Sequence, residues 1–196
     1  MIDPDNITIY NQKHTELEEV LLFWILAAGK NAKTSALGLE KLLTQLAEAQ
    51  GAKTREPFSL IRNVKKEKLA LMMKACGLGC FNNKATSFKD LVNSGIDLKT
   101  CTVDELEEIH GIGPKTARCF LIHSCKGVEY AGLDTHILKF LGEQGYEVGK
   151  STPSSKKKYR ELEQAFISIA KKSGKSIADF DLEIWKRGKN KTMVKA

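Results

Sequence analysis

The sequence predicts an all-α fold. Through most of the 196 residues, apolar side chains recur three and four positions apart, which is the spacing of one helix face. No stretch of useful length alternates apolar and polar residues as a half-buried strand does. Hydrophobic residues make up 42% of the chain, enough for a sizeable core in one domain or one compact two-lobed unit. We expect about nine or ten helices.

The first half of the chain contains four or five of these helices. In the first, over residues 14–29, the apolar positions at helical spacing are Leu17, Val20, Leu21, Trp24 and Ile25. A second helix is expected from Ser35 to Gly51, where glycine ends the pattern. Residues 55–79 hold one or two more, and residues 87–95 form a short one.

Local capping signals mark the helix starts in the second half. Thr102, with Glu105 three residues later, forms a capping box before a short helix that is expected to end at His110. Pro114 stands at a first-turn position, where its missing N–H costs nothing. Asp134 is placed to cap another helix.

The basic charge of the chain favours an anionic partner. The formal net charge is +7, and nucleic acid is the first candidate for such a partner. One lysine-rich stretch, Gly149–Lys158, is expected to be an exposed loop that either faces solvent or contacts phosphate. Five cysteines, an odd number, and a polar N-terminus without a leader predict an intracellular protein of the cytoplasm or nucleoid. The longest apolar stretch is too short to cross a membrane.

Residues 111–113 predict a tight hairpin between two helices. Gly111 and Gly113 flank one apolar residue, Ile112, which we expect to lie between the helices. The backbone N–H groups of such a hairpin and of the helix that follows point outward and bind phosphate. We therefore assign Gly111, Ile112, Gly113 and Thr116 to the binding of a DNA backbone.

Lys115 and Asp134 form the candidate catalytic pair. Lys115 lies at the start of the helix after the hairpin, where the positive end of the helix dipole is expected to favour its neutral, nucleophilic form. Asp134 follows 134 − 115 = 19 residues later, at the start of the next helix. The linker between them is long enough for both side chains to face one cleft.

The segment GIGPKTARCFLIHSCKGVEYAGLDTHILKF, residues 111–140, resembles the helix-hairpin-helix and catalytic-aspartate signature of the DNA glycosylase superfamily. In that resemblance Lys115 matches the Schiff-base lysine and Asp134 the catalytic aspartate. The tail, residues 154–189, is similar to the C-terminal part of the archaeal-type, second-class 8-oxoguanine glycosylases. Altogether the resemblance covers roughly residues 78–189.

This resemblance implies a two-lobed helical glycosylase fold with a DNA-binding cleft between the lobes. One unit then spans residues 1–196, with the helix-hairpin-helix at about 102–125, the catalytic loop and helix at about 131–145 and C-terminal helices at 155–188. It implies base excision with AP lyase activity on double-stranded DNA that carries an oxidised base, 8-oxoguanine being favoured. A monomer without a cofactor is expected, because flipping a nucleotide needs only one cleft.

The resemblance also suggests the residues of a base pocket. Phe81 or Trp185 is expected to stack on the flipped base. Gly29, Lys30 and Asn31 stand where relatives carry a wedge residue; the alternative is a helix stop followed by a loop. In second-class relatives the terminal lysine helps to recognise the lesion. This chain ends in alanine, and Lys195 is the expected substitute.

The cysteines predict no metal centre. Neither Cys76 with Cys80 nor Cys119 with His123 completes a tetrad of structural-zinc spacing, so buried thiols are expected. Relatives of endonuclease III often carry an iron–sulfur cluster after the catalytic region, but no cysteine follows Cys125.

Two other functions remain open at this point. The scaffold also resembles phage-type enzymes that modify thymine in DNA, in which case Lys30 and Lys33 would bind a pyrophosphate and the glycosidic bond would stay intact. The second alternative is a non-catalytic DNA-binding module that uses the hairpin alone.

Overall fold

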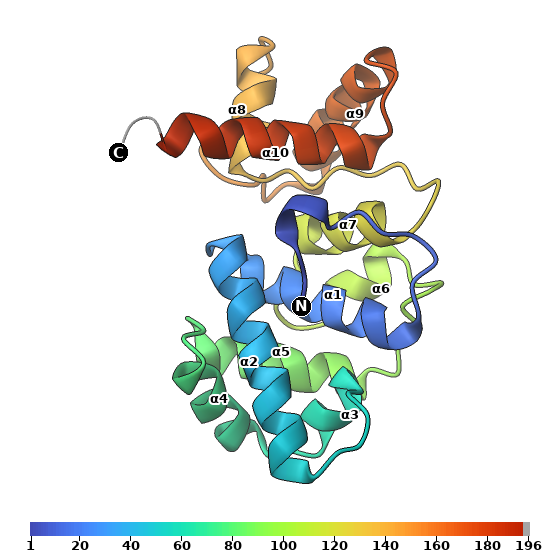
Figure 1. Ribbon diagram of the computed structural model, residues 1–196. Helices are drawn as coiled ribbons and strands as arrows, with labels where there is room; N and C mark the ends of the chain where they lie inside the picture. Colours follow the sequence, from blue (N-terminus) through green and yellow to red (C-terminus); the bar gives the residue numbers. More distant parts are fainter. Residues whose placement is uncertain (194–196) are drawn as a thin grey trace.

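The computed structural model describes residues 1–193, with side chains as far as residue 188, and it confirms the all-α prediction (Figure 1). The described residues form one short 3-10 helix and ten α-helices, in the order η1 (Pro4–Asn6), α1 (His14–Ala27), α2 (Ala32–Gln50), α3 (Pro57–Arg62), α4 (Lys66–Ala75), α5 (Phe81–Asn93), α6 (Val103–Glu107), α7 (Pro114–Ser124), α8 (Thr135–Glu143), α9 (Lys156–Lys172) and α10 (Ile177–Met193). Among them, no helix is both long enough and apolar enough to cross a bilayer.

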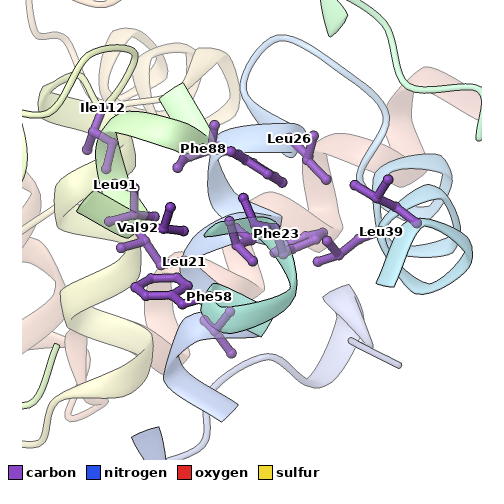
Figure 2. Close-up of a cluster of buried hydrophobic side chains, with 14 of the residues drawn as sticks. Leu21, Phe23, Leu26, Leu39, Phe58, Phe88, Leu91, Val92 and Ile112 are labelled. Atoms are coloured by element: carbon purple, nitrogen blue, oxygen red, sulfur yellow. The ribbon is translucent and has the colours of Figure 1, made fainter. Parts of the chain in front are cut away.

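The helices form two lobes, each with its own hydrophobic core. The larger lobe contains α1 to α7, and Figure 2 shows part of its core, in which Phe23 and Leu26 of α1 lie among buried side chains of α2, α3 and α5. The smaller lobe contains α8, α9 and α10, whose core includes three aromatic rings in contact: Phe140, Phe166 and Phe180. In Figure 1 the smaller lobe lies across one end of the larger, next to α7.

The predicted helix starts are confirmed in the second half of the chain. The hydroxyl of Thr102 accepts a hydrogen bond from the Glu105 amide at 3.3 Å, and the Glu105 carboxylate accepts one from the Thr102 amide at 2.8 Å. Pro114 occupies the first turn of α7, and Asp134 caps α8.

Three expectations about local structure differ from what is found. Helix α5 starts at Phe81, six residues before the expected start. The residues after Phe81 are mostly polar, so they show no apolar periodicity in the sequence, although Lys84 among them is buried. Helix α6 ends at Glu107 instead of His110, since a turn leads into the hairpin. Cys76 and Cys119 are buried as expected, but Cys80 is exposed in a left-handed conformation just before α5.

A buried ion network centred on Arg118 of α7 joins the two lobes. Its guanidinium donates from Nη1 to the Glu107 carboxylate of α6 at 2.7 Å and from Nε to the Glu163 carboxylate of α9 at 2.7 Å. The guanidinium carbon also lies 4.5 Å from the ring centre of Tyr159, another residue of α9. One side chain therefore ties α6 and α7 of the larger lobe to α9 of the smaller.

The same network holds the loop that carries the predicted catalytic aspartate. Glu163 accepts a hydrogen bond from the Ala131 amide at 3.0 Å. The Tyr159 hydroxyl donates to the Ala131 carbonyl at 2.9 Å and accepts from the Leu133 amide at 3.1 Å. Thr152, from the lysine-rich loop, donates to the Leu133 carbonyl at 2.9 Å. Hydrogen bonds thus fix the backbone of Ala131 and Leu133, just before α8 begins.

We expect Glu163→Ala to destabilise the protein by about 3 kcal/mol, because it leaves a buried guanidinium with only one carboxylate partner. The measurement is urea unfolding followed by circular dichroism. Glu161→Ala is the matched control on the same helix, since its 3.8 Å ion pair with Lys158 is exposed. That control should cost less than about 0.5 kcal/mol. Equal stability of the two variants would show that the network does not hold the lobes together.

Candidate active site

A cavity of about 810 Å³ lies where the two lobes meet. Its walls come from α1 and the loop after it, from the glycine hairpin and α7, from the loop before α8, and from α10. The N-terminal segment contributes Pro4 and Ile7, and the lysine-rich loop contributes Ser151 and Thr152. Segments far apart in the sequence therefore enclose one space, whose volume suits a small-molecule-sized group.

Lys115 enters this cavity from the first turn of α7. Its Nζ lies 5.2 Å from the ring centre of Trp24 on α1. Burial lowers the pKa of Lys115, but nearby acidic groups, among them Asp134 and Asp181, raise it by more, and the net pKa lies above the ordinary value. The expectation of a lowered pKa from the helix dipole is therefore wrong, because acidic groups surround the amine.

Asp134 reaches the same cavity from the start of α8. Its Oδ1 accepts hydrogen bonds from the backbone amides of His136 at 2.8 Å and Ile137 at 2.9 Å. Burial raises the pKa of Asp134 and the charge of Asp181 raises it further, while the Ile137 hydrogen bond and the charge of Lys115 lower it; the net direction is upward. One ammonium group thus shares the cavity with two carboxyl groups.

One face of α7 lines the cavity with three functional side chains spaced four residues apart: Lys115, Cys119 and His123. Burial raises the pKa of the Cys119 thiol, so the thiol is neutral at physiological pH. The charges that hold Lys115 protonated at that pH are therefore those of Asp134 and Asp181.

Two buried polar atoms at the cavity have no hydrogen-bond partner among the described residues. They are Nε1 of Trp24 and Oδ1 of Asp181. One is a donor and the other is an acceptor, and a buried polar atom without a partner costs free energy. Both atoms are buried and not exposed to the cavity, so a bound group that offers an acceptor and a donor would satisfy them only after a local side-chain adjustment.

The hairpin forms the tight turn that the sequence predicts. Gly111 has φ +83°, and a Cβ atom there would lie 2.0 Å from Oγ of Ser87, so only glycine fits. Ile112 is buried in the larger core, and Thr116 is buried beside the cavity. Gly113 has an extended backbone and open space where a Cβ would stand.

The other predicted pocket residues divide into three groups. Gly29, Lys30, Asn31 and Trp185 line the cavity. Gly29, Lys30 and Asn31 also form the helix stop and loop that the sequence offered as the alternative to a wedge. The Asn31 side chain caps α2, because it accepts a hydrogen bond from the Thr34 amide at 3.1 Å. Phe81 does not line the cavity; it packs against the larger core with Lys74 over its ring. Lys195 lies outside the described residues.

Sequence reasoning missed three residues of the cavity: Trp24, His123 and Asp181. Helical spacing could have identified two of them. His123 continues the helix face that starts at Lys115, and Asp181 lies one helical turn before the predicted pocket residue Trp185. Trp24 gave no separate signal, because its spacing is also that of a core residue.

Solved structures of DNA glycosylases share this fold. The 8-oxoguanine DNA glycosylase of Thermotoga maritima is 24% identical with a TM-score of 0.63, over 89% of this chain and 80% of that one. The Methanocaldococcus jannaschii 8-oxoguanine glycosylase/lyase, solved with DNA containing 8-oxoguanine, is 23% identical with a TM-score of 0.65, over 89% and 81%. The H. pylori 3-methyladenine DNA glycosylase is 20% identical with a TM-score of 0.68, over 91% and 87%. The fold is therefore that of helix-hairpin-helix DNA glycosylases.

Residues 6–175 match the family model described as 8-oxoguanine DNA glycosylase, and the chain belongs to this family. A curated relative, the 8-oxoguanine DNA glycosylase/AP lyase of Picrophilus torridus, is 38% identical over 80 residues. That stretch covers 41% of this chain and 37% of the relative, so the match spans little more than a third of the relative's length.

We expect Gly111→Ala to destabilise the protein by about 2 kcal/mol or more, through its left-handed backbone and the clash with Ser87. Gly113→Ala is the matched control, because its backbone suits alanine and its Cβ meets no atom within 4 Å. Its stability should change by less than about 0.5 kcal/mol. Chemical unfolding of both variants tests this difference, and a similar loss in the two would contradict the assignment of the strained position.

Proposed function

We propose that this protein is a base-excision DNA glycosylase with AP lyase activity, which removes an oxidised base from double-stranded DNA. The observation that carries the proposal is the position of Lys115 and Asp134 in one cavity, beside a glycine hairpin. Membership of the 8-oxoguanine DNA glycosylase family supports 8-oxoguanine as the favoured lesion. One cleft is enough for this reaction, and we propose that the chain acts as a single unit and a monomer.

The hairpin supplies the grip on the DNA backbone. The open space next to Gly113 lies at the start of α7, where backbone N–H groups and the helix dipole favour a phosphate. Such contacts do not depend on sequence, and they fix the register of the enzyme on the duplex. The net charge of +7 favours the same partner.

The cavity receives the flipped nucleotide. Nε1 of Trp24 donates to an acceptor on the base, and Oδ1 of Asp181 accepts from one of its N–H groups. Trp185 provides an aromatic wall beside them, since it also lines the cavity. The two unsatisfied protein atoms gain these partners once their side chains adjust to the bound base.

In the chemical step, Nζ of Lys115 bonds to C1′ of the sugar while the bond from C1′ to the base breaks. The ammonium must first lose a proton, and the raised pKa of Asp134 makes this carboxylate a better proton acceptor. Asp134 passes this proton to the departing base, and its carboxylate, negative again, stabilises positive charge on the sugar. The sugar ring then opens to a Schiff base, and loss of a C2′ proton breaks the C3′–O bond and nicks the strand.

The position of the other lysines bears on the thymine-modifying alternative. Lys33 lies 3.3 Å from the Asp5 carboxylate, so one of the two lysines proposed to hold pyrophosphate has an acidic partner. The Lys30 side chain lies beside Gly79, and Lys30 also lines the cavity. A transferase of that class leaves the strand intact, and a non-catalytic module leaves it intact as well. Strand nicking therefore separates the proposed function from both.

Lys115→Gln should abolish covalent trapping while duplex binding stays nearly unchanged, because the amide cannot form a Schiff base. The assay is borohydride trapping on end-labelled duplexes with 8-oxoguanine, an oxidised pyrimidine, an abasic site or no lesion. Lys139→Gln, at an exposed position of α8, is the control and should trap normally. A normal adduct in the Lys115 variant would remove this lysine from the mechanism.

Asp134→Asn should slow base release by about 100-fold or more, because the amide can neither accept the lysine proton nor balance charge on the sugar. The asparagine oxygen can still accept from the amides of His136 and Ile137, so the fold of α8 should persist. Single-turnover excision from a lesion-containing duplex measures the rate. A rate equal to that of the unaltered enzyme would exclude Asp134 from the reaction.

A further inference from the structure

The N-terminal segment forms a strap, residues 4–10, across the end of α7 next to the cavity (Figure 1). The Ile9 amide donates to the carbonyl of His123 at 3.0 Å, and Ile7 is buried in the larger core. The Tyr10 hydroxyl donates to the carbonyl of Ile122 at 3.4 Å. Backbone and side-chain contacts thus fix the strap on α7 at the position where His123 meets the cavity.

The imidazole of His123 is held on three sides. Its Nδ1 lies 2.7 Å from Oγ1 of Thr8, and its Nε2 lies 3.3 Å from Oδ2 of Asp181. Its ring stacks on that of Trp24, with centroids 5.5 Å apart and planes 14° from parallel. Only 1% of His123 is exposed. The ring therefore lacks contact with solvent and links the strap to two groups of the candidate base pocket.

These partners determine the tautomer of the neutral imidazole. An ionised carboxylate only accepts hydrogen bonds, so Nε2 must carry the hydrogen that is donated to Asp181. Nδ1 is then an acceptor, and the Thr8 hydroxyl is its donor. Asp181 therefore selects the Nε2–H form, and Thr8 completes it by supplying the donor that the buried Nδ1 needs. If Nδ1 carried the proton instead, Nε2 and Oδ2 would face each other as two acceptors.

We propose that Thr8 is a positioning residue of the base pocket, which acts through His123 to orient the carboxylate of Asp181. With Oδ2 held by the imidazole, Oδ1 remains for the N–H group of the flipped base. Without the Thr8 donor, the buried Nδ1 loses its partner and the ring is no longer fixed against Asp181, so Oδ2 is held less firmly and Oδ1 loses its orientation toward the base. This inference rests on the proposed function, because it assigns a role in base binding.

The test separates base recognition from the lyase chemistry. Thr8→Val keeps the shape of the side chain and removes its donor, while Thr8→Ser keeps the donor. We expect Thr8→Val to lower single-turnover excision of the lesion by about ten-fold, the value of one hydrogen bond to a polar partner. Borohydride trapping on a duplex with a preformed abasic site should change less than two-fold, since no base has to be bound. Thr8→Ser should restore excision.

A purely structural role for Thr8 predicts a different result. In that case Thr8→Val would lower excision and abasic-site trapping together, with a lower unfolding temperature, and the proposal would be overturned. Unchanged excision in Thr8→Val would overturn it as well.

A second measurement does not depend on activity. In ¹⁵N-histidine NMR spectra of the whole protein, which has four histidines, the signals missing in His123→Gln identify this residue. We expect the Nε2–H tautomer in the unaltered protein and in Thr8→Ser, and a shifted Nδ1 signal in Thr8→Val, where that nitrogen has lost its hydrogen-bond donor. A doubly protonated ring, or identical spectra in all three, would overturn the proposal. If the unaltered enzyme excised no lesion, the proposed function would fail, and these spectra would still decide whether Thr8 controls His123.

Discussion

The pairing of Arg118 with two carboxylates from opposite lobes is the interaction on which the active site depends. Its guanidinium fills the space between α6 and α9, and one of its partners, Glu163, also binds the backbone of the loop that leads to Asp134. Buried ion pairs contribute little net stability, but a broken one is costly. The network therefore acts mainly by permitting only one relative position of the lobes, the one that brings Asp134 to Lys115.

The charges around Lys115 give the cavity a resting state that differs from its reactive state. Asp134 and Asp181 favour the ammonium form of the lysine before substrate enters. A base held by Asp181 would neutralise or screen one of these charges, and the sugar would place positive charge next to the other. In the proposed reaction, substrate binding thus changes the environment that holds the proton on Lys115, so that this lysine can act as the nucleophile once its target is in place.

The sequence was sufficient for the fold class, the helix caps and the helix starts that carry Lys115 and Asp134, because each has a local cause. A capping box, a proline in the first turn and a glycine with positive φ are all determined within a few residues. The base pocket was predicted less well, since its walls come from distant segments. Trp24 looked like a core residue, and Phe81, an aromatic residue near the right part of the chain, packs elsewhere. The pKa of Lys115 was also beyond local reasoning, because its carboxylate neighbours belong to other helices.

The division into two cores has a consequence for the order in which the protein matures during synthesis. The core of the larger lobe is complete by Leu121, so the hairpin can form while the rest of the chain is still on the ribosome. The partners that fix the loop before Asp134 come from α9 and emerge much later. Under the proposed function, a nascent or truncated chain would therefore acquire the DNA-binding hairpin before the loop that carries Asp134 is fixed. Such a fragment would bind DNA without cutting it, and it would compete with the full-length chain for the same sites.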